Sequence, residues 1–285
     1  MIQQLFNVFK LRIGIFMAVT AVATLMIMPG MTPTIWQITV LALAIILSSA
    51  SAGAFNQYME RDLDALMPRT RNRPFVTGAF SQSRWWLLLM AVLLLVGVAA
   101  AGFMLNVMAA FYVFLGAFFY GVVYTVWLKR RTWLNIVIGG AAGSFAVLAG
   151  AAVVDPSLGP LPVIFAIVLF LWTPSHFWSL AIALHKDYAA AGVPMLPVVV
   201  GDRVAAQVIF GNSLSLVIIS LLPILFGLNW IYLMGAMISG GYLLYRNLQL
   251  IRDPSPKIAM SNFFASLIQL VILLSFAVVD VQVLG

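Results

Sequence analysis

The chain has 285 residues, of which 64% are hydrophobic and only 8% charged, and its net charge is +7. A soluble domain contains about 45–50% apolar residues and covers its surface with charged side chains, which this chain has too few to do. The absence of cysteine excludes a disulfide framework, a thiolate metal site and a cysteine nucleophile. Composition therefore predicts an integral membrane protein.

Apolar windows of about 20 residues, the length that crosses the hydrocarbon core of a bilayer, follow one another along the whole chain. They predict an all-α polytopic membrane protein that forms a single domain over residues 1–285 in the lipid bilayer. The first apolar stretch is followed by no small-residue cleavage site, so we expect its helix to be retained and the membrane to be a bacterial plasma membrane. We expect nine transmembrane helices, over residues 12–29, 35–56, 85–103, 107–128, 133–154, 161–184, 205–227, 230–246 and 260–281.

The basic residues fall on one side of these expected helices. If the N-terminus is inside, the inner segments hold all 15 Lys and Arg residues, and the outer loops carry only Asp155 and Asp280. Cytoplasmic loops retain Lys and Arg, so the pattern predicts a cytoplasmic N-terminus and two long cytoplasmic loops, 56–84 and 185–204. It also explains the positive charge without a nucleic-acid partner.

An amide and two carboxylates recur every fourth residue at the start of the first long loop. At about 100° per residue, Asn56, Glu60 and Asp64 form one stripe on a helix, while Asp62 points elsewhere. Such hard oxygen ligands suit Mg²⁺, which takes one or two carboxylates, waters and a substrate phosphate. The stripe predicts a catalytic metal site. The alternative is an interfacial helix end whose acids pair with arginines such as Arg61.

Three arginines follow the acidic stripe, at Arg69, Arg71 and Arg73. A guanidinium group offers a planar fork of donors to phosphate oxygens, and Mg²⁺ bridges the remaining oxygens. The combination predicts a site that binds a diphosphate. The alternative is an ordinary positively charged inner loop.

A second group of polar residues lies near the other long loop. His176 and Asp187 are eleven residues apart, which on a straight helix returns to within about 20° of the same face, so both are candidates to line one cavity. Asp187 is a candidate catalytic residue that would hold a second metal or orient Lys186 toward phosphate. The alternatives are a histidine that only packs between helices and a simple charge pair between Lys186 and Asp187.

Two motifs resemble those of one protein family. The first, Asn56-x-x-x-Glu60-x-x-x-Asp64 followed by Arg69-Thr70-x-x-Arg73-Pro74, resembles the first signature of the UbiA superfamily of intramembrane prenyltransferases. The second, Thr173-Pro174-Ser175-His176-Phe177-Trp178 followed by Asp187-Tyr188-x-x-Ala191-Gly192-Val193-Pro194-Met195-Leu196-Pro197, resembles the branch that acts on heme, for which a Glu at position 60 is also typical.

The sequence departs from that family at two places. The Asp-x-x-x-Asp motif of the quinone-pathway members falls on Leu184 and Tyr188, which leaves Asp187 as the only carboxylate there. The Lys-Pro pair that is usual near the start of the family is Lys10-Leu11 here, so no role is carried over to that position.

The resemblance implies a nine-helix prenyltransferase bundle that moves a farnesyl group from farnesyl diphosphate to the 2-vinyl group of heme B, with addition of water, to give heme O. It implies Mg²⁺ as cofactor, heme B as substrate, Lys186 at the diphosphate, and His176 and Tyr188 at the heme. The pathway suggests heme A synthase or terminal oxidase assembly as partners. The alternatives are a prenyltransferase for an aromatic quinone precursor and a heme-handling transporter without catalysis.

Overall fold

The computed structural model describes residues 1–30 and 32–284, and every regular element in these residues is a helix. The long helices are α2 (Leu11–Ile27), α3 (Ile35–Met59), α6 (Arg84–Met104), α7 (Val107–Phe118), α9 (Ala141–Ala152), α10 (Pro160–Ala183), α13 (Asp202–Ile219), α14 (Trp230–Arg252) and α15 (Pro256–Leu284). The short ones are α1 (Ile2–Val8), α4 (Arg61–Leu66), α5 (Pro74–Thr77), α8 (Asn135–Gly139), α11 (His185–Ala190), α12 (Leu196–Val200), the π-helix η1 (Phe119–Leu128) and the 3₁₀ helix η2 (Leu222–Phe226). The predicted all-α class is confirmed.

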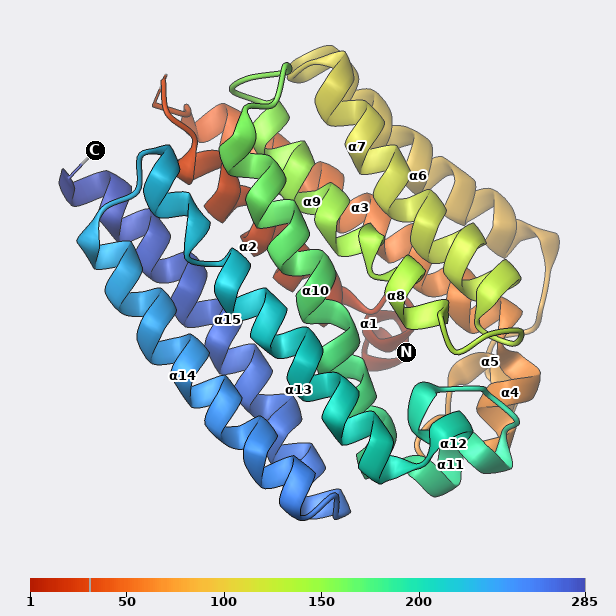
Figure 1. Ribbon diagram of the computed structural model, residues 1–285. Coiled ribbons are helices and arrows are strands. Elements are labelled where there is room, and N and C mark those ends of the chain that lie inside the picture. Colours follow the sequence, from red (N-terminus) through yellow and green to blue (C-terminus); the bar gives the residue numbers. More distant parts are fainter. Residues whose placement is uncertain (31, 285) are drawn as a thin grey trace.

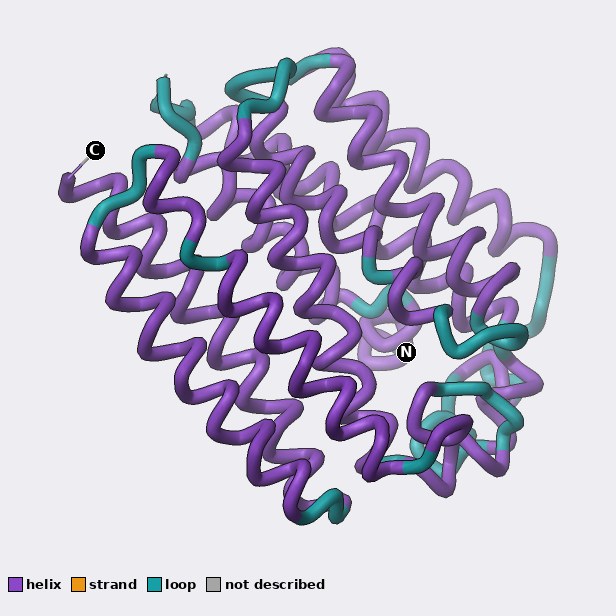
Figure 2. Tube along the Cα trace, in the orientation of Figure 1, coloured by secondary structure: helices purple, strands orange, loops and turns teal. Residues whose placement is uncertain are grey.

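The long helices run side by side and form one bundle (Figure 1). α10 lies in its middle and packs against α9, α13 and α15, while α2 packs against α3, α9 and α15. The short helices α4, α5, α11 and α12 gather at one end of the bundle. Connections outside the helices are short and concentrate at the two ends (Figure 2).

Seven helical stretches of the described residues are long and apolar enough to cross a membrane, or eight if α1 and α2, bent by 53°, form one span. Three of the seven join consecutive elements: α7 with η1, α8 with α9, and α13 with η2. Helix α14, whose last turns carry Arg246 and Arg252, is not among them. A count of nine transmembrane helices is therefore not confirmed and stays a prediction.

One expected helix is preceded by a bend, and two others change within their length. The chain bends before the helix expected at 12–29, because Lys10 has a left-handed backbone with φ 47°. The helix expected at 107–128 changes to π-helical bonding at Phe119. The helix expected at 133–154 breaks at Gly140, where an added Cβ would lie 2.9 Å from the Thr173 side chain, so the absence of a side chain lets α10 approach closely.

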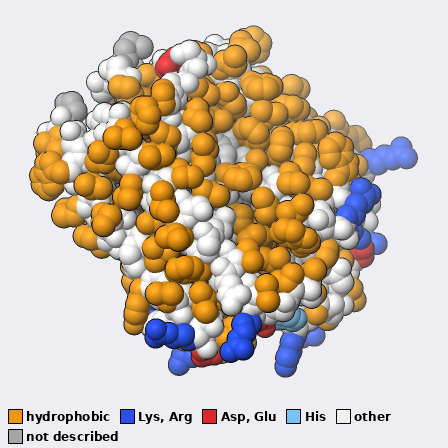
Figure 3. Space-filling view, viewed as in Figure 1, with side chains coloured by type: hydrophobic (Ala, Val, Ile, Leu, Met, Phe, Trp, Pro, Cys, Tyr) orange, Lys and Arg blue, Asp and Glu red, His pale blue; other side chains and the backbone are white. Residues whose placement is uncertain are grey.

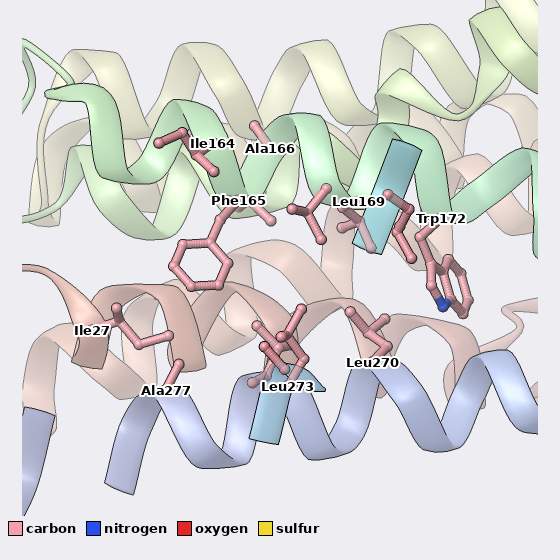
Figure 4. Close-up of a cluster of buried hydrophobic side chains, with 14 of the residues drawn as sticks. Ile27, Ile164, Phe165, Ala166, Leu169, Trp172, Leu270, Leu273 and Ala277 are labelled. Carbon is pink, nitrogen blue, oxygen red and sulfur yellow. The ribbon is translucent and has the colours of Figure 1, made fainter. Parts of the chain in front are cut away.

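A buried apolar layer holds the middle of the bundle together. Figure 4 shows Phe165 and Leu169 of α10 facing Leu273 and Ala277 of α15, with Ile27 of α2 closing one side. These side chains are at most 2% exposed. Close packing, rather than exclusion of water, is the main attraction between helices in lipid, so this layer fixes how α2, α10 and α15 sit together.

The outer surface of the bundle is apolar, and its basic side chains collect at one end. Hydrophobic side chains cover most of the face in Figure 3, while the Lys and Arg residues lie at the end where α4, α5, α11 and α12 gather. Phe103 and Trp85 are 92% and 77% exposed. Apolar exposure on this scale suits contact with lipid and would be unstable in water.

Asp280 does not lie in an outer loop, as the sequence suggested, but within α15, where it is fully buried. Its two carboxylate oxygens accept hydrogen bonds from the backbone N–H groups of Asn229, at 2.6 Å, and Tyr232, at 3.0 Å. The carboxylate therefore caps the N-terminus of α14, where negative charge is favoured.

The two predicted loops pack against each other through a second buried cluster. Leu63 and Met67, at α4, share this cluster with Tyr188 and Val193 from the segment around α11. Trp178 of α10 belongs to it as well. Residues from loops 56–84 and 185–204 thus meet at one end of the bundle, where the candidate site lies.

Candidate active site

The predicted stripe of oxygen ligands is formed where α3 gives way to α4. The helix break falls at Glu60, yet the backbone N–H of Glu60 donates to Asn56 at 3.0 Å, and that of Asp64 donates to Glu60 at 2.8 Å. The helical register therefore continues across the break, and the three residues stay in line. Their exposed fractions are 2%, 1% and 4% for Asn56, Glu60 and Asp64.

Both carboxylates of the stripe are paired with basic side chains. Lys129 Nζ lies 2.5 Å from Glu60 Oε2. One nitrogen of Arg73, Nη1, donates to both oxygens of Asp64, at 2.8 and 2.7 Å. Pairing of this kind is needed because an isolated charge at a buried position is strongly unfavourable.

The amide of the stripe has a basic partner too. Lys10 Nζ donates to Asn56 Oδ1 at 2.6 Å and to the Tyr120 hydroxyl at 2.8 Å. Lys10 reaches this position from the bend between α1 and α2, and Gly53 leaves room for its chain, since a Cβ there would lie 3.2 Å from Lys10 Cβ. We call Lys10, Asn56, Glu60, Asp64, Arg73 and Lys129 the charged cluster.

The π-helix η1 aligns three side chains with the charged cluster. Tyr120 receives the hydrogen bond from Lys10, Thr125 accepts one from Asn56 Nδ2 at 2.9 Å, and Lys129 pairs with Glu60. Five residues separate Tyr120 from Thr125, which on an α-helix would turn them about 140° apart. The wider turn of η1 brings both to the same side, a use of π-helical segments that recurs at functional sites.

The charged cluster carries a net positive charge and one unpaired oxygen. Its two carboxylates and three cations leave one positive charge. Glu60 Oε1 is buried and has no hydrogen-bond partner. An unpaired buried carboxylate oxygen costs free energy, so its presence marks a place for a cation or another ligand atom. The arrangement suits a polyanion bound together with a metal ion.

The protein oxygens can fill only part of the coordination shell of Mg²⁺, so water and substrate phosphate must supply the other ligands. Among residues 1–30 and 32–284, no three His, Asp or Glu side chains come together as a metal-binding group. Mg²⁺ commonly binds through one or two carboxylates and completes its shell with waters and substrate phosphates, so Glu60 Oε1 suffices as an anchor. Asn56 and Asp64 already have basic partners, and their predicted role as metal ligands stays a prediction.

The three arginines of the first long loop differ in burial and in their partners. Arg73 is half-buried and joins the charged cluster, whereas Arg69 and Arg71 are exposed. Arg69 lies near the other loop: burial raises the pKa of the Tyr188 hydroxyl, and the positive charge of Arg69 opposes that rise. The charge of Glu60 also acts on Tyr188, which places Tyr188 near the charged cluster.

The predicted pair Lys186 and Asp187 lies beside Tyr188 in α11. Lys186 is exposed, Asp187 is half-buried, and no salt bridge joins them in the described part of the chain. The straight-helix relation between His176 and Asp187 is wrong, because α10 ends at Ala183 and α11 is a separate helix. Asp187 as a metal ligand stays a prediction.

His176 lies deep in the bundle between α10 and α15. Its ring is stacked between Trp172, with ring centres 4.3 Å apart, and Phe263, at 4.1 Å. Nδ1 is hydrogen-bonded to Ser266 Oγ at 2.8 Å. Both ring faces are therefore covered, and only Nε2 is left for iron. The predicted contact with heme stays a prediction.

Asp62 points away from the charged cluster, as expected. It pairs with Arg130 at 2.6 Å in an exposed position. The hydrogen bond from Arg130 holds the pKa of the Asp62 carboxyl below its ordinary value. An ion pair in water contributes little to stability, so this pair is a natural contrast to Asp64 and Arg73.

Four residues of the site were missed by sequence reasoning: Lys10, Tyr120, Thr125 and Lys129. For Lys10 and Lys129, the sequence pattern indicated only a position on the cytoplasmic side of the membrane. A signal was available, because both stand at the inner ends of expected helices, at the same interface as the acidic stripe. Nothing in the sequence pattern distinguished Tyr120 and Thr125 from other polar residues of an apolar helix.

A lipid-facing bundle with buried ionised groups at one end defines an integral membrane protein with a charged binding site at the edge of the bilayer. The family model described as UbiA prenyltransferase family matches residues 16–268. The chain belongs to this family.

Curated relatives match over nearly the whole chain. Protoheme IX farnesyltransferase 2 of Paramagnetospirillum magneticum is 56% identical, over 98% of this chain and 97% of the relative. Protoheme IX farnesyltransferase 1 of the same organism is 48% identical, over 95% of each. Protoheme IX farnesyltransferase 1 of Cenarchaeum symbiosum is 37% identical, over 98% of this chain and 95% of the relative.

Solved structures share the fold. A structure described as digeranylgeranylglyceryl phosphate synthase has a TM-score of 0.81 at 17% identity and covers 98% of both chains. A UbiA homolog from Archaeoglobus fulgidus bound to DMAPP and Mg²⁺ has a TM-score of 0.71 at 18% identity, over 99% of this chain and 100% of that one. At these identities the likeness establishes the fold alone.

Proposed function

We propose that this protein transfers the farnesyl group of farnesyl diphosphate to the 2-vinyl group of heme B, with addition of water, and so makes heme O. The observation that carries this proposal is the 56% identity, over 98% of the chain, to a relative named protoheme IX farnesyltransferase 2. The charged cluster supports it, because a positively charged buried site is what a diphosphate leaving group needs.

The charged cluster holds the diphosphate end of the donor. Lys10, Arg73 and Lys129 supply fixed donors to phosphate oxygens, and their positions do not change as charge develops on the leaving group. Arg69 and Lys186, at the exposed edge, meet the diphosphate as it enters. Arg71 is exposed and contributes only general positive charge.

Glu60 Oε1 would hold Mg²⁺, an ion that is bound together with DMAPP in the described structure of a fold relative. When bound, Mg²⁺ stabilises the negative charge that the diphosphate gains as it leaves. Asn56 and Asp64 hold Lys10 and Arg73 in place beside it. Asp187, half-buried and next to Tyr188 in α11, contributes to the polar boundary of the site.

The reaction breaks the allylic C–O bond of the donor and forms a C–C bond to the terminal carbon of the vinyl group. Water adds to the neighbouring carbon and releases one proton, which balances the step. The helices keep other water away from the reactive allylic carbon. Tyr120 and Tyr124 stack on each other, at 5.6 Å and 14°, beside Lys10 and Lys129, so their rings form a wall suited to positive charge.

The heme acceptor lies within the bundle, above the charged cluster. Tyr188, which is buried and close to Arg69, contacts the acceptor in this proposal. His176 offers Nε2 to the heme iron, since its Nδ1 is held by Ser266. The assignment of His176 is tested by a variant below.

The protein crosses the bacterial inner membrane with nine helices, and its N-terminus and both motif loops face the cytoplasm. The support is the gathering of basic residues at one end of the bundle (Figure 3). Heme A synthase and the assembly of a terminal oxidase are the partners that this product would serve.

Purified protein supplied with Mg²⁺, farnesyl diphosphate and heme B should convert the heme to a more hydrophobic species and leave 4-hydroxybenzoate unmodified. Prenylation of 4-hydroxybenzoate, with heme B unchanged, would favour a quinone-pathway enzyme instead. Heme flux across proteoliposomes without release of diphosphate would favour a transporter.

A further inference from the structure

The charged cluster offers few free oxygen atoms to a metal. Lys10 occupies Asn56 Oδ1 at 2.6 Å, and Arg73 occupies both oxygens of Asp64 at 2.8 and 2.7 Å. A metal bound through either residue would lie beside a basic side chain that already contacts the same oxygen, and the two positive charges would repel each other at a buried position.

Glu60 differs from the other two members of the stripe. Lys129 occupies Oε2 at 2.5 Å, but Oε1 is buried and unpartnered, in a residue that is 1% exposed. Among the described residues of the chain, no group of three His, Asp or Glu side chains exists to bind another ion. Within the charged cluster, Glu60 Oε1 is therefore the protein oxygen ready for a metal ion.

Several contacts fix the Lys10 side chain within the charged cluster. Its ammonium group donates to Asn56 and to the Tyr120 hydroxyl, and lies 5.4 Å from the centre of the Tyr120 ring. Its backbone adopts a left-handed conformation at the bend before α2, and Gly53 gives its side chain space. A left-handed backbone at a residue other than glycine is uncommon and is kept where the surroundings require it.

We propose that this site binds one divalent cation, at Glu60 Oε1, and that the Lys10 ammonium takes the place of a second ion at the diphosphate. The proposal rests on the proposed function, because it assigns a diphosphate ligand to the charged cluster. The cluster alone carries one net positive charge, and a single divalent ion raises this to three. That charge matches a prenyl diphosphate without a second metal.

The number of bound ions tests the proposal directly. Mn²⁺, which is visible by electron paramagnetic resonance, would be titrated into purified protein saturated with farnesyl thiolodiphosphate, a donor analogue that does not react. The expected result is one Mn²⁺ per chain in the wild type and none in Glu60→Gln. Two Mn²⁺ per chain in the wild type would overturn the proposal.

Binding of the analogue tests the role of Lys10. Lys10→Met should weaken analogue binding by about tenfold or more, the free energy of one charge-assisted hydrogen bond, while still binding one Mn²⁺. Lys257→Met is the matched control, because Lys257 is exposed at the start of α15, and it should leave affinity unchanged. Equal affinities for the two variants would contradict the proposal.

Lys10→Arg separates loss of charge from loss of folding. It keeps the positive charge and should recover part of the affinity that Lys10→Met loses. None of these measurements uses heme. A protein that fails to farnesylate heme B but binds one Mn²⁺ with the analogue would therefore refute the proposed acceptor and leave the single-ion site standing.

Discussion

Two buried polar regions of the bundle differ in how their groups are paired. In the charged cluster, ionised side chains pair with each other and leave Glu60 Oε1 without a partner. Between α10 and α15, the hydrogen bonds join uncharged groups: Ser179 donates to the Ser175 carbonyl at 2.6 Å, and Asn262 donates to Ser179 at 2.8 Å, although the buried Gln269 amide has no partner among the described residues. The His176–Ser266 contact belongs to the same neutral network.

This difference suggests that the ionised region binds a ligand and that the neutral region holds the helices together. Hydrogen bonds between neutral groups inside membrane proteins contribute about 0.6 kcal/mol each, which suits side chains that hold helices together. Ionised groups at buried positions are expensive, and replacing them by apolar residues is often neutral or stabilising, so their presence is better explained by ligand binding. Variants in the two regions should therefore affect different measurements.

Glu60→Gln should produce the largest loss. The amide keeps the shape of the side chain but removes the charge that pairs with Lys129 and that we propose as the anchor of Mg²⁺. We expect turnover to fall by about 10²–10³-fold, the effect of removing one stabilising group from a reacting anion. Heme O formation by purified variant is the measurement, with thermal unfolding as the control for folding. Wild-type turnover would remove Glu60 from the mechanism.

Asp64→Asn should follow, with effects on both activity and stability. An amide cannot balance the Arg73 guanidinium, whose side chain is 21% exposed. We expect kcat/KM to fall by about a hundredfold and the free energy of unfolding by about 2 kcal/mol, below the ~3–5 kcal/mol of a fully buried pair because solvent screens part of the charge.

Asp62→Asn is the matched control for Asp64→Asn. It removes a carboxylate from the same short helix, but one that forms an exposed pair with Arg130. Activity and unfolding should stay near the wild-type values, because exposed pairs contribute little. Equal effects at positions 62 and 64 would mean that burial of the charged cluster has no functional meaning.

His176→Phe tests whether the neutral network also binds substrate. The aromatic ring preserves stacking between Trp172 and Phe263 but removes Nε2. If Nε2 binds the iron, heme B affinity should fall by about tenfold, or ~1.4 kcal/mol, with no change in binding of the diphosphate analogue. Titration followed by heme absorbance is the measurement, and Ser266→Ala, which removes only the serine partner, is the control. Unchanged heme affinity would assign His176 to packing.

Ser179→Ala should have the smallest effect among the variants of buried groups. It removes the acceptor of the Asn262 hydrogen bond within the neutral network. We expect the free energy of unfolding to fall by about 0.6–1.7 kcal/mol, with kcat and KM unchanged. Unfolding in denaturant and steady-state assays of the same preparation give both quantities. A fall in kcat without loss of stability would bring the neutral network into the catalytic site.

The fold was predictable where long apolar runs determine it. Each expected membrane segment lies on a helix of the structure, because the bilayer leaves helices as the way to satisfy the backbone. The bend at Lys10 and the π-helix at Phe119–Leu128 were not predictable, since both depend on contacts with distant parts of the chain. The hydropathy of a segment carries no information about such long-range contacts.

The site was predictable only where its residues share one helix. Asn56, Glu60 and Asp64 are four residues apart, and helical geometry alone puts them in line. Lys10 and Lys129 come from 46 and 69 residues away from their partners in the stripe, so their contacts required the tertiary structure. The loss of a straight helix at Leu184 likewise separated Asp187 from His176.

Farnesylation of heme B by this protein is tested most directly by mass spectrometry. Heme would be extracted after incubation with Mg²⁺, farnesyl diphosphate and heme B in water enriched in heavy oxygen. The expected product is a heme that has gained one farnesyl group and one water, carries one heavy oxygen atom from the solvent, and forms in step with released diphosphate in the wild type but not in Glu60→Gln. Unmodified heme, or product formed equally by Glu60→Gln, would contradict it.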